Sequence, residues 1–176
     1  LKDRLYLTDV ARNGFDGASW PEAEDALCPI VGEVDDPKHQ RKFPLEIAFS
    51  EYGHIAVSGA PTTGKTTFLQ TLVMSLALTY TPDEVSIYVM DFGSMGMRAF
   101  SQLPHVGGIA ELGDDERVMK LAQLLTDELT ERKNKFAQAG VGSIKAYQET
   151  GAEKIPYIVL AVDNFHVMQH SYPDLE

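Results

Sequence analysis

The chain has 176 residues, enough for one domain of usual size, and with 44% hydrophobic and 23% charged residues it is globular rather than disordered, collagen-like or coiled-coil. Fifteen Lys and Arg against 26 Asp and Glu give a formal net charge of −11, the wrong sign for a surface that neutralises DNA or RNA phosphates. The single cysteine, Cys28, excludes an intramolecular disulfide and a multi-cysteine zinc site, so a reducing compartment is the simplest interpretation.

Neither a membrane span nor a secretory leader is predicted. The longest wholly apolar run, residues 157–162, is far shorter than the ~20 residues that a spanning helix needs. The chain begins with Leu1, and its opening residues carry charges where a secretory leader is apolar. We therefore expect the chain to be part of a longer polypeptide whose other segments hold any membrane anchor.

Residues 1–44 are predicted to be an irregular lead-in that packs on the rest of the chain, because turn-forming pairs interrupt any periodicity. These pairs are Asn13-Gly14, Asp16-Gly17, Trp20-Pro21, Cys28-Pro29, Asp36-Pro37 and Phe43-Pro44. From residue 45 the pattern becomes regular, so residues 45–176 are predicted to form the core domain.

Strands and helices are predicted to alternate along this core. The predicted elements are a strand at 45–49, a strand at 54–59, a glycine-rich turn, a helix at 65–80 stopped by Pro82, a strand at 85–91, a loop at 93–97, a turn at 103–108, a long helix capped by Asp114 and carrying apolar residues from Val118 to Phe136, a helix at 143–150, and a strand at 155–164. Such alternation is typical of a parallel sheet with right-handed crossovers, and we expect the strand before the glycine-rich turn to lie at its centre.

The glycine-rich turn matches the P-loop pattern G-x-x-x-x-G-K-[ST] at every position, after a predicted strand and at the start of a predicted helix. Its backbone N–H groups would cradle phosphates, Lys65 would reach the β- and γ-phosphates, and the Thr66 hydroxyl would bind Mg²⁺. The predicted phosphate-binding residues are Gly59, Ala60, Pro61, Thr62, Thr63, Gly64, Lys65, Thr66 and Thr67. The alternative is a Gly-Pro turn that matches by chance.

A second motif pairs with the P-loop. Mg²⁺ also needs a carboxylate at the end of a buried apolar strand, and residues 158–163, which end in Asp163, fit this requirement. The alternative is that Asp163 only caps the next turn.

The residue after Asp163 bears on hydrolysis. Additional-strand P-loop ATPases generally place a glutamate there to polarise the attacking water, whereas this chain has Asn164. An amide can orient water but cannot accept its proton, and losing a positioned base typically removes ~10²–10⁴ in rate. We therefore predict ATP binding with slow or no hydrolysis, unless Asp91 or a residue beyond Glu176 is the base. If Asn164 alone limits catalysis, Asn164→Glu should raise turnover; otherwise an arginine donated in trans is also required.

Three other patterns have plainer explanations. Residues 91–93 spell the D-F-G motif of protein kinases without the other kinase motifs, which indicates a strand end where Asp91 can still face a nucleotide. His166 and His170 have the spacing of a metal-binding pair, but no third ligand is evident, and a solvated turn is favoured. The six methionines are scattered, as expected of packing residues.

The order of these motifs resembles the ATPase modules of the FtsK/SpoIIIE type, over about residues 29–176. The segments that carry the resemblance are GEVDDPKHQ at 32–40, GAPTTGKTT at 59–67, TPDEVSIYVMDFG at 81–93, LPHVGG at 103–108 and ERK at 131–133. More closely, the chain is similar to the later modules of the tandem ATPases of type VII secretion, the EccC and EssC proteins.

The resemblance implies a RecA-like (additional-strand) α/β P-loop NTPase with a mostly parallel central sheet flanked by helices. Another strand should separate the P-loop strand from the strand ending in Asp163, and further elements of the module should follow residue 176. Residues 59–67 become the Walker A loop and Asp163 the Walker B aspartate. Later modules of this family often lack the catalytic glutamate, which agrees with Asn164 and leaves Mg²⁺ and ATP binding intact.

The implied partners are neighbouring ATPase modules of the same polypeptide and small helical WXG-type secretion substrates, at the cytoplasmic face of the cell membrane. An alternative from the same superfamily is a DNA translocase motor, but the net charge and the modest basic clusters, 38–42 and 132–135, argue against it. In a third, non-enzymatic interpretation, ATP only orders the module against its neighbours. DNA-stimulated turnover, turnover without DNA and binding without turnover would distinguish these three.

Overall fold

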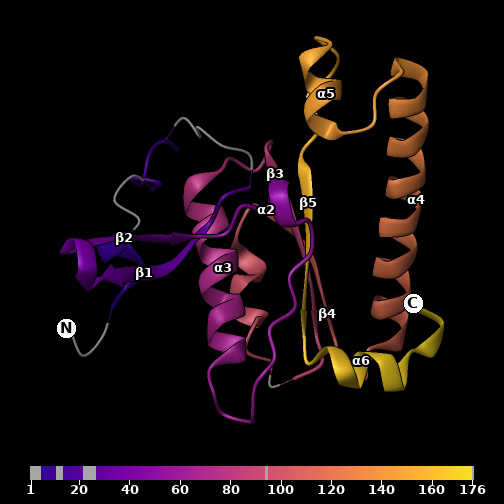
Figure 1. The fold of residues 1–176 in the computed structure, drawn as a ribbon. Coiled ribbons are helices and arrows are strands. Elements are labelled where there is room, and N and C mark those ends of the chain that lie inside the picture. Colours follow the sequence, from indigo (N-terminus) through magenta and orange to yellow (C-terminus); the bar gives the residue numbers. More distant parts are fainter. Residues whose placement is uncertain (1–4, 11–13, 22–26, 94, 176) are drawn as a thin grey trace. The chain divides into compact units, whose positions relative to one another are not determined.

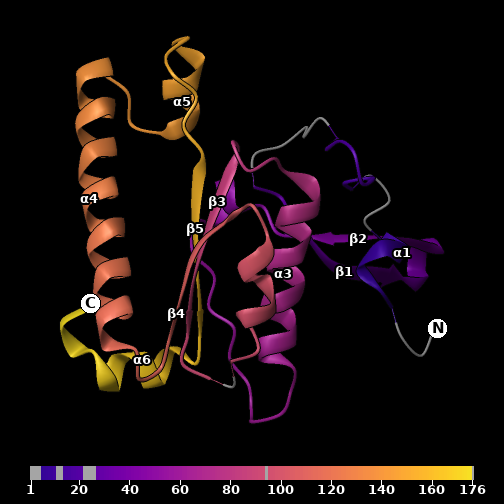
Figure 2. The ribbon, with the colours of Figure 1, turned by 180° about the vertical axis from the view of Figure 1, so that it is seen from behind.

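The computed structural model describes residues 5–10, 14–21, 27–93 and 95–175 (Figures 1 and 2). The chain divides into two compact units, Leu1–Thr81 and Pro82–Glu176. Asn13 in one predicted turn and Ser94 in the predicted loop lie outside the described residues. Within those residues, none of the helices combines the length and apolar character needed to cross a membrane.

The first unit contains an antiparallel hairpin and one long helix. Its elements are α1 (Leu7–Val10), β1 (Ile30–Asp36), η1 (Pro37–His39), β2 (Arg41–Glu46), α2 (Phe49–Tyr52) and α3 (Lys65–Thr79). β1 pairs with β2, and the Asp36 side chain accepts a hydrogen bond from the backbone N–H of His39 in the turn between them. Ion pairs join Asp36 to Arg41 at 3.1 Å and Glu33 to Lys42 at 3.0 Å.

This hairpin lies in the stretch for which the sequence predicted no regular element, and β2 ends at Glu46 instead of running over 45–49. The sequence prediction treated Pro37 and Pro44 as breaks. Pro37 instead starts the turn, and Pro44 is tolerated because β2 is an edge strand of the two-stranded sheet. The division of the chain into a lead-in of residues 1–44 and a core of residues 45–176 stays a prediction.

The helix α3 begins at Lys65, as the sequence predicted, and ends at Thr79, one residue before the predicted end, with Tyr80 as its C-cap. Its buried side chains are Leu72, Val73, Ser75, Leu76 and Ala77. Hydrogen bonds tie earlier residues to this helix: Trp20 Nε1 donates to the carbonyl of Ala77, and the N–H of Ile30 donates to Ser75 Oγ. The helix that follows the P-loop is therefore anchored in its own unit along its C-terminal half.

The second unit is built on a parallel sheet, as predicted. Among the described residues its strand order is β4 (Val106–Glu111), β3 (Val85–Asp91), β5 (Tyr157–Asp163). The remaining elements are η2 (Arg98–Gln102), α4 (Asp115–Ala139), α5 (Ile144–Glu149), α6 (Phe165–Ser171) and η3 (Pro173–Leu175). Asp114 caps α4 by accepting a hydrogen bond from the N–H of Arg117, and Ser143 caps α5 in the same manner.

Strand β4 was missed by the sequence analysis, which predicted only a turn over residues 103–108. Glycine is depleted in strands, so the pair Gly107-Gly108 indicated a turn. In the structure the ring of Tyr88 lies against Gly107: a Cβ atom at this position would be 2.6 Å from Tyr88 Cε1. Gly107 therefore permits the close approach of a neighbouring side chain within the sheet.

The predicted strand at 54–59, and its central place in the parallel sheet, are not found. Residues 53–60 belong to neither sheet, and their apolar residues Ile55 and Val57 are 40% and 47% exposed. An extended segment becomes a strand only when a neighbouring strand exchanges hydrogen bonds with it. The strand that should separate the P-loop strand from the one ending in Asp163 is absent from the described residues, and β3 holds the centre of the sheet.

One hydrophobic core joins the sheet of the second unit to its helices. Buried Met90 and Phe92 at the end of β3 pack with Ala110 of β4, Val118 and Leu121 of α4, and Met168 of α6. Figures 1 and 2 show α4 running alongside the sheet, with α6 at the end where the strands finish. This core fixes the carboxyl ends of β3 and β5, where the register aligns Asp91 with Asp163.

Candidate functional site

The P-loop backbone is left-handed at two positions, Thr62 and Gly64. Gly64 has φ of +90°, in the left-handed region, directly before α3 begins at Lys65. Gly59 is needed for another reason: a Cβ atom there would be 2.8 Å from Thr63 Oγ1. The Thr63 hydroxyl cannot easily move away because it donates a hydrogen bond of 2.8 Å to the carbonyl of Ala60. This hydrogen bond joins two residues of the loop and holds the Thr63 hydroxyl in place.

Lys65 lies over this loop. Its Nζ donates hydrogen bonds to the carbonyl oxygens of Gly59 at 2.9 Å and Ala60 at 2.8 Å. No side chain caps Gly64, the N-cap of α3, so the positive end of the helix dipole opens onto the loop. The lysine ammonium and the helix N-terminus meet at one place, which is the donor set that phosphates require.

A pocket of about 240 Å³ opens at this place, lined by Thr62, Gly64, Lys65, Thr66 and Thr67. Pockets that enclose a whole small ligand usually measure about 300–1,000 Å³. The pocket therefore suits a phosphate chain, and the P-loop residues of the first unit fit the group that the sequence predicts for them.

In the second unit, two aspartates end neighbouring strands. Asp91 is 1% exposed and Asp163 is 8% exposed. Both carboxylate oxygens of Asp91 accept backbone hydrogen bonds of 3.0 Å, Oδ1 from the N–H of Gly93 and Oδ2 from the N–H of Met97. Asp91 is thus committed to the loop after β3, which argues against it as the substitute base that the sequence analysis considered.

Asn164 has a structural role that the sequence did not indicate. Its backbone is left-handed, with φ of +58°, and it forms the N-cap position of α6. Its side-chain Nδ2 donates a hydrogen bond of 3.3 Å to the carbonyl of Phe92. Asparagine tolerates the left-handed region better than most residues, so the amide here satisfies a local requirement of the fold.

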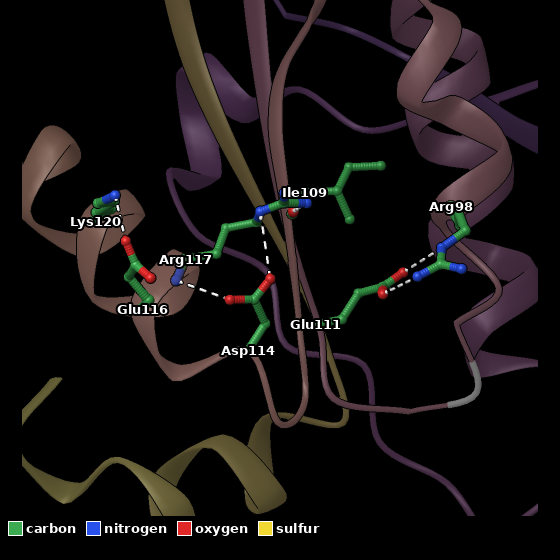
Figure 3. A network of polar contacts seen from close by, with 7 residues as sticks. All are labelled: Arg98, Ile109, Glu111, Asp114, Glu116, Arg117 and Lys120. Atoms are coloured by element: carbon green, nitrogen blue, oxygen red, sulfur yellow. Dashed lines mark hydrogen bonds and ion pairs between the residues drawn. The ribbon is translucent and has the colours of Figure 1, made fainter.

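The end of β4 carries a charged network that sequence reasoning missed (Figure 3). Arg98 binds Glu111 through both Nε, at 2.9 Å, and Nη2, at 2.5 Å, and this pair raises the pKa of Arg98. Arg117 contacts both Asp114 and the carbonyl of Ile109. Arg98 and Glu111 are 13 residues apart in the sequence, so no local sequence pattern could have predicted that they pair.

The rings of His166 and His170 lie 4.5 Å apart on α6. No group of three or more His, Cys, Asp or Glu side chains in the described part of the chain is arranged to hold a metal ion. Both histidines are exposed, but they lie on helix α6 (Phe165–Ser171) and not in the turn that the sequence analysis favoured.

The fold and the P-loop together define a class of protein. A parallel α/β sheet with flanking helices, accompanied by G-x-x-x-x-G-K-T at the start of a helix, is the architecture of RecA-like P-loop NTPases. The chain belongs to the FtsK/SpoIIIE family, whose sequence model matches residues 22–176.

Its relatives are ATPases of type VII secretion. The chain is 34% identical over 177 residues to the ESX secretion system protein EccC of Thermomonospora curvata, and 29% identical over 171 residues to the type VII secretion system protein EssC of Staphylococcus aureus. Each match covers 97% of this chain but only 13% and 12% of the respective relative. The chain thus spans about an eighth of the length of these proteins.

Solved structures agree with this assignment. The structure of ATPases 2 and 3 of Thermomonospora curvata EccC, in complex with a signal sequence peptide, matches with a TM-score of 0.81 at 34% identity, covering 93% of this chain and 30% of that one. ATPases 2 and 3 of Geobacillus thermodenitrificans EssC match with a TM-score of 0.77 at 31% identity, covering 89% and 30%. The predicted fold class and the resemblance to EccC and EssC modules are confirmed.

Proposed function

We propose that this chain is a nucleotide-binding module of a type VII secretion ATPase, which binds Mg·ATP and hydrolyses it slowly or not at all. The observation that carries the proposal is the position of Lys65, whose ammonium lies on the P-loop carbonyls beside an uncapped helix N-terminus. Residues 59–67 would bind the phosphates. Thr66 and Asp163 would supply oxygen ligands to Mg²⁺, which neutralises phosphate charge when bound.

We propose slow hydrolysis because neither of the residues considered as the acceptor of a proton from water is suited to that role. Asn164 is an amide that is already engaged with Phe92, and Asp91 accepts two backbone hydrogen bonds while almost fully buried. Neither is placed to act as a general base. We propose that the module is a nucleotide-responsive part of its polypeptide, with a base or an arginine supplied from elsewhere if turnover occurs at all.

The proposed partners are neighbouring ATPase modules and a protein substrate. One solved relative holds a signal sequence peptide, which favours a polypeptide ligand over DNA for this family branch. The net charge of −11 supports the same choice, because a duplex-threading motor needs basic surfaces. We propose that the module works at the cytoplasmic face of the membrane, anchored through segments outside this chain, and exports small helical WXG-type substrates with its neighbours.

Calorimetric titration with Mg·ATP, followed by phosphate release on the same sample, tests this function. We expect a micromolar dissociation constant, about −8 kcal/mol, with little phosphate released. Lys65→Ala should abolish binding, whereas Lys133→Ala, a change at an exposed lysine of α4, should leave it unchanged. Unchanged affinity in Lys65→Ala would refute the site, turnover of tens per second would refute slow hydrolysis, and DNA-stimulated turnover would favour the translocase.

A further inference from the structure

The carboxyl ends of β3 and β5 are joined by more than their strand register. Phe92, the first residue after β3, donates its N–H to the carbonyl of Asp163 at 3.1 Å. Its own carbonyl accepts the hydrogen bond from Asn164 Nδ2 at 3.3 Å. The Phe92 ring is 2% exposed within the core. Both backbone groups of Phe92 are thus held by two consecutive residues, Asp163 and Asn164, at the end of β5.

The residue after Phe92 is then brought against the Asp163 side chain. A Cβ atom built on Gly93 would lie 2.7 Å from Asp163 Oδ2 and 3.4 Å from its Cγ. Real Cβ atoms do not approach oxygen this closely, so any side chain at 93 must displace the carboxylate. Gly93 does not have a positive φ. Glycine is therefore required here for the space it leaves, and not for its backbone freedom.

Asp91 fixes Gly93 in this place. Asp91 Oδ1 accepts a hydrogen bond from the N–H of Gly93 at 3.0 Å. The same oxygen would lie 3.5 Å from a Cβ atom at residue 93. Because Asp91 is buried and its other oxygen binds the N–H of Met97, its carboxylate cannot swing aside to let the chain at 93 move. Gly93 is therefore held by Asp91 through its N–H, and the Asp163 carboxylate occupies the space that a side chain at this position would need.

We propose that Asp91, Gly93 and Asn164 form a clasp that sets the position of the Asp163 carboxylate, and that they are positioning residues for the Mg²⁺-dependent part of nucleotide binding. The inference rests on the proposed function, in which Asp163 is a Mg²⁺ ligand. It gives Asn164 a role that does not involve water, and it explains the glycine of the D-F-G sequence without reference to kinases. The phosphate grip of the P-loop does not depend on this clasp.

The test separates metal-dependent from metal-independent binding in the intact protein. ATP affinity is measured with Mg²⁺ and with EDTA, for Gly93→Ala and for Gly142→Ala. Gly142 is the matched control because a Cβ atom added there would meet nothing within 4 Å, and its φ is not positive. We expect Gly93→Ala to keep its affinity in EDTA within about twofold and to lose at least fivefold of the gain that Mg²⁺ provides, while Gly142→Ala matches the unmodified protein.

Asp163→Asn distinguishes the failure of this inference from the failure of the function on which it rests. If Asp163→Asn loses the Mg²⁺-dependent gain and Gly93→Ala keeps it, the clasp is refuted. If Asp163→Asn keeps the gain, Asp163 is not a Mg²⁺ ligand and the proposed Mg²⁺ site is refuted with it. Should Gly93→Ala not fold, Asn164→Gly replaces it: glycine permits the left-handed backbone but removes the bond to Phe92, and an unchanged Mg²⁺ gain in this variant overturns the proposal.

Discussion

The side-chain amide of Asn164 donates to the carbonyl of Phe92, 72 residues earlier in the chain, from a backbone with φ of +58°. The residue after Asp163 thus satisfies two local requirements at once, a left-handed backbone and a hydrogen-bond donor. A glutamate would satisfy neither. The absence of a catalytic base at this position is therefore coupled to how β5 turns into α6.

Asn164→Glu tests this coupling. A glutamate in the left-handed region costs about 1–2 kcal/mol, and its carboxylate cannot donate to Phe92. We expect this variant to lose about 1–2 kcal/mol in free energy of unfolding from its backbone, in addition to the lost hydrogen bond. If Asn164 alone limits catalysis, it should also release phosphate faster than the unmodified protein. Denaturant unfolding and phosphate release on the same preparation measure both effects.

Asn164→Gly is the control for that experiment. Glycine adopts the left-handed conformation without cost but offers neither the donor nor a base. It should lose only the net value of one hydrogen bond, about 0.5–1.5 kcal/mol, with no gain in phosphate release. If Asn164→Glu is as stable as the unmodified protein, the backbone of residue 164 is not the constraint inferred from the structure.

The Tyr172 hydroxyl donates to Asp115 in the first turn of α4. This hydrogen bond is the main cause that raises the pKa of Tyr172 above its usual value, with burial contributing less. Because the folded-state pKa is the higher one, the stabilisation is complete below the unfolded pKa of about 10 and is lost as pH rises through the folded pKa. Tyr172→Phe should lose about 1 kcal/mol at neutral pH.

The alkaline range supplies the check on Tyr172. Above pH 10 the stability of the unmodified protein should fall toward that of Tyr172→Phe, so the difference between them narrows in thermal or denaturant unfolding curves. Tyr157, whose raised pKa comes from burial alone, is present in both proteins and cancels in this comparison. A difference that stays constant from pH 7 to pH 11 would contradict the assigned bond.

Gly107→Ala should disturb the packing of β4 on β3. The added methyl group would meet Tyr88 Cε1 at 2.6 Å and Cζ at 2.9 Å, and overpacking of this kind typically costs about 1–3 kcal/mol. Tyr88→Leu in the same chain removes the ring and should recover part of the loss, which a double-mutant cycle measures. Gly142→Ala serves again as the open-space control, and additive effects at residues 88 and 107 would contradict the contact.

Some elements could be predicted and others were missed because they depend on interactions at different sequence separations. The P-loop, the α3 start at Lys65 and the caps Asp114 and Ser143 were predictable because each depends on residues within a few positions. Strand β4 was missed, and residues 54–59 were assigned a strand, because strands depend on distant partners. The roles of Gly93, Gly107 and Asn164 could not be predicted for the same reason. Each depends on a residue distant in sequence: Asp163, Tyr88 and Phe92, respectively.

Alanine substitutions at the two P-loop glycines should impair nucleotide binding for different physical reasons. Gly59→Ala places a methyl group 2.8 Å from Thr63 Oγ1, so the fault is a contact that removal of the hydroxyl can relieve. Gly64→Ala forces a side chain onto a backbone with φ of +90°, which costs about 1–2 kcal/mol whatever its neighbours are. Each change alone should weaken Mg·ATP binding at least tenfold.

Thr63→Ala in each background separates the two faults. Together with Gly59→Ala it should restore most of the affinity, because the Thr63 Cβ lies 3.8 Å from the added atom and can stay in place. Together with Gly64→Ala it should restore nothing, and Thr63→Ala alone reports the value of the Ala60 hydrogen bond. Calorimetric titration of the five variants measures this pattern, and equal rescue in both backgrounds would mean that the loop adopts another conformation when nucleotide binds.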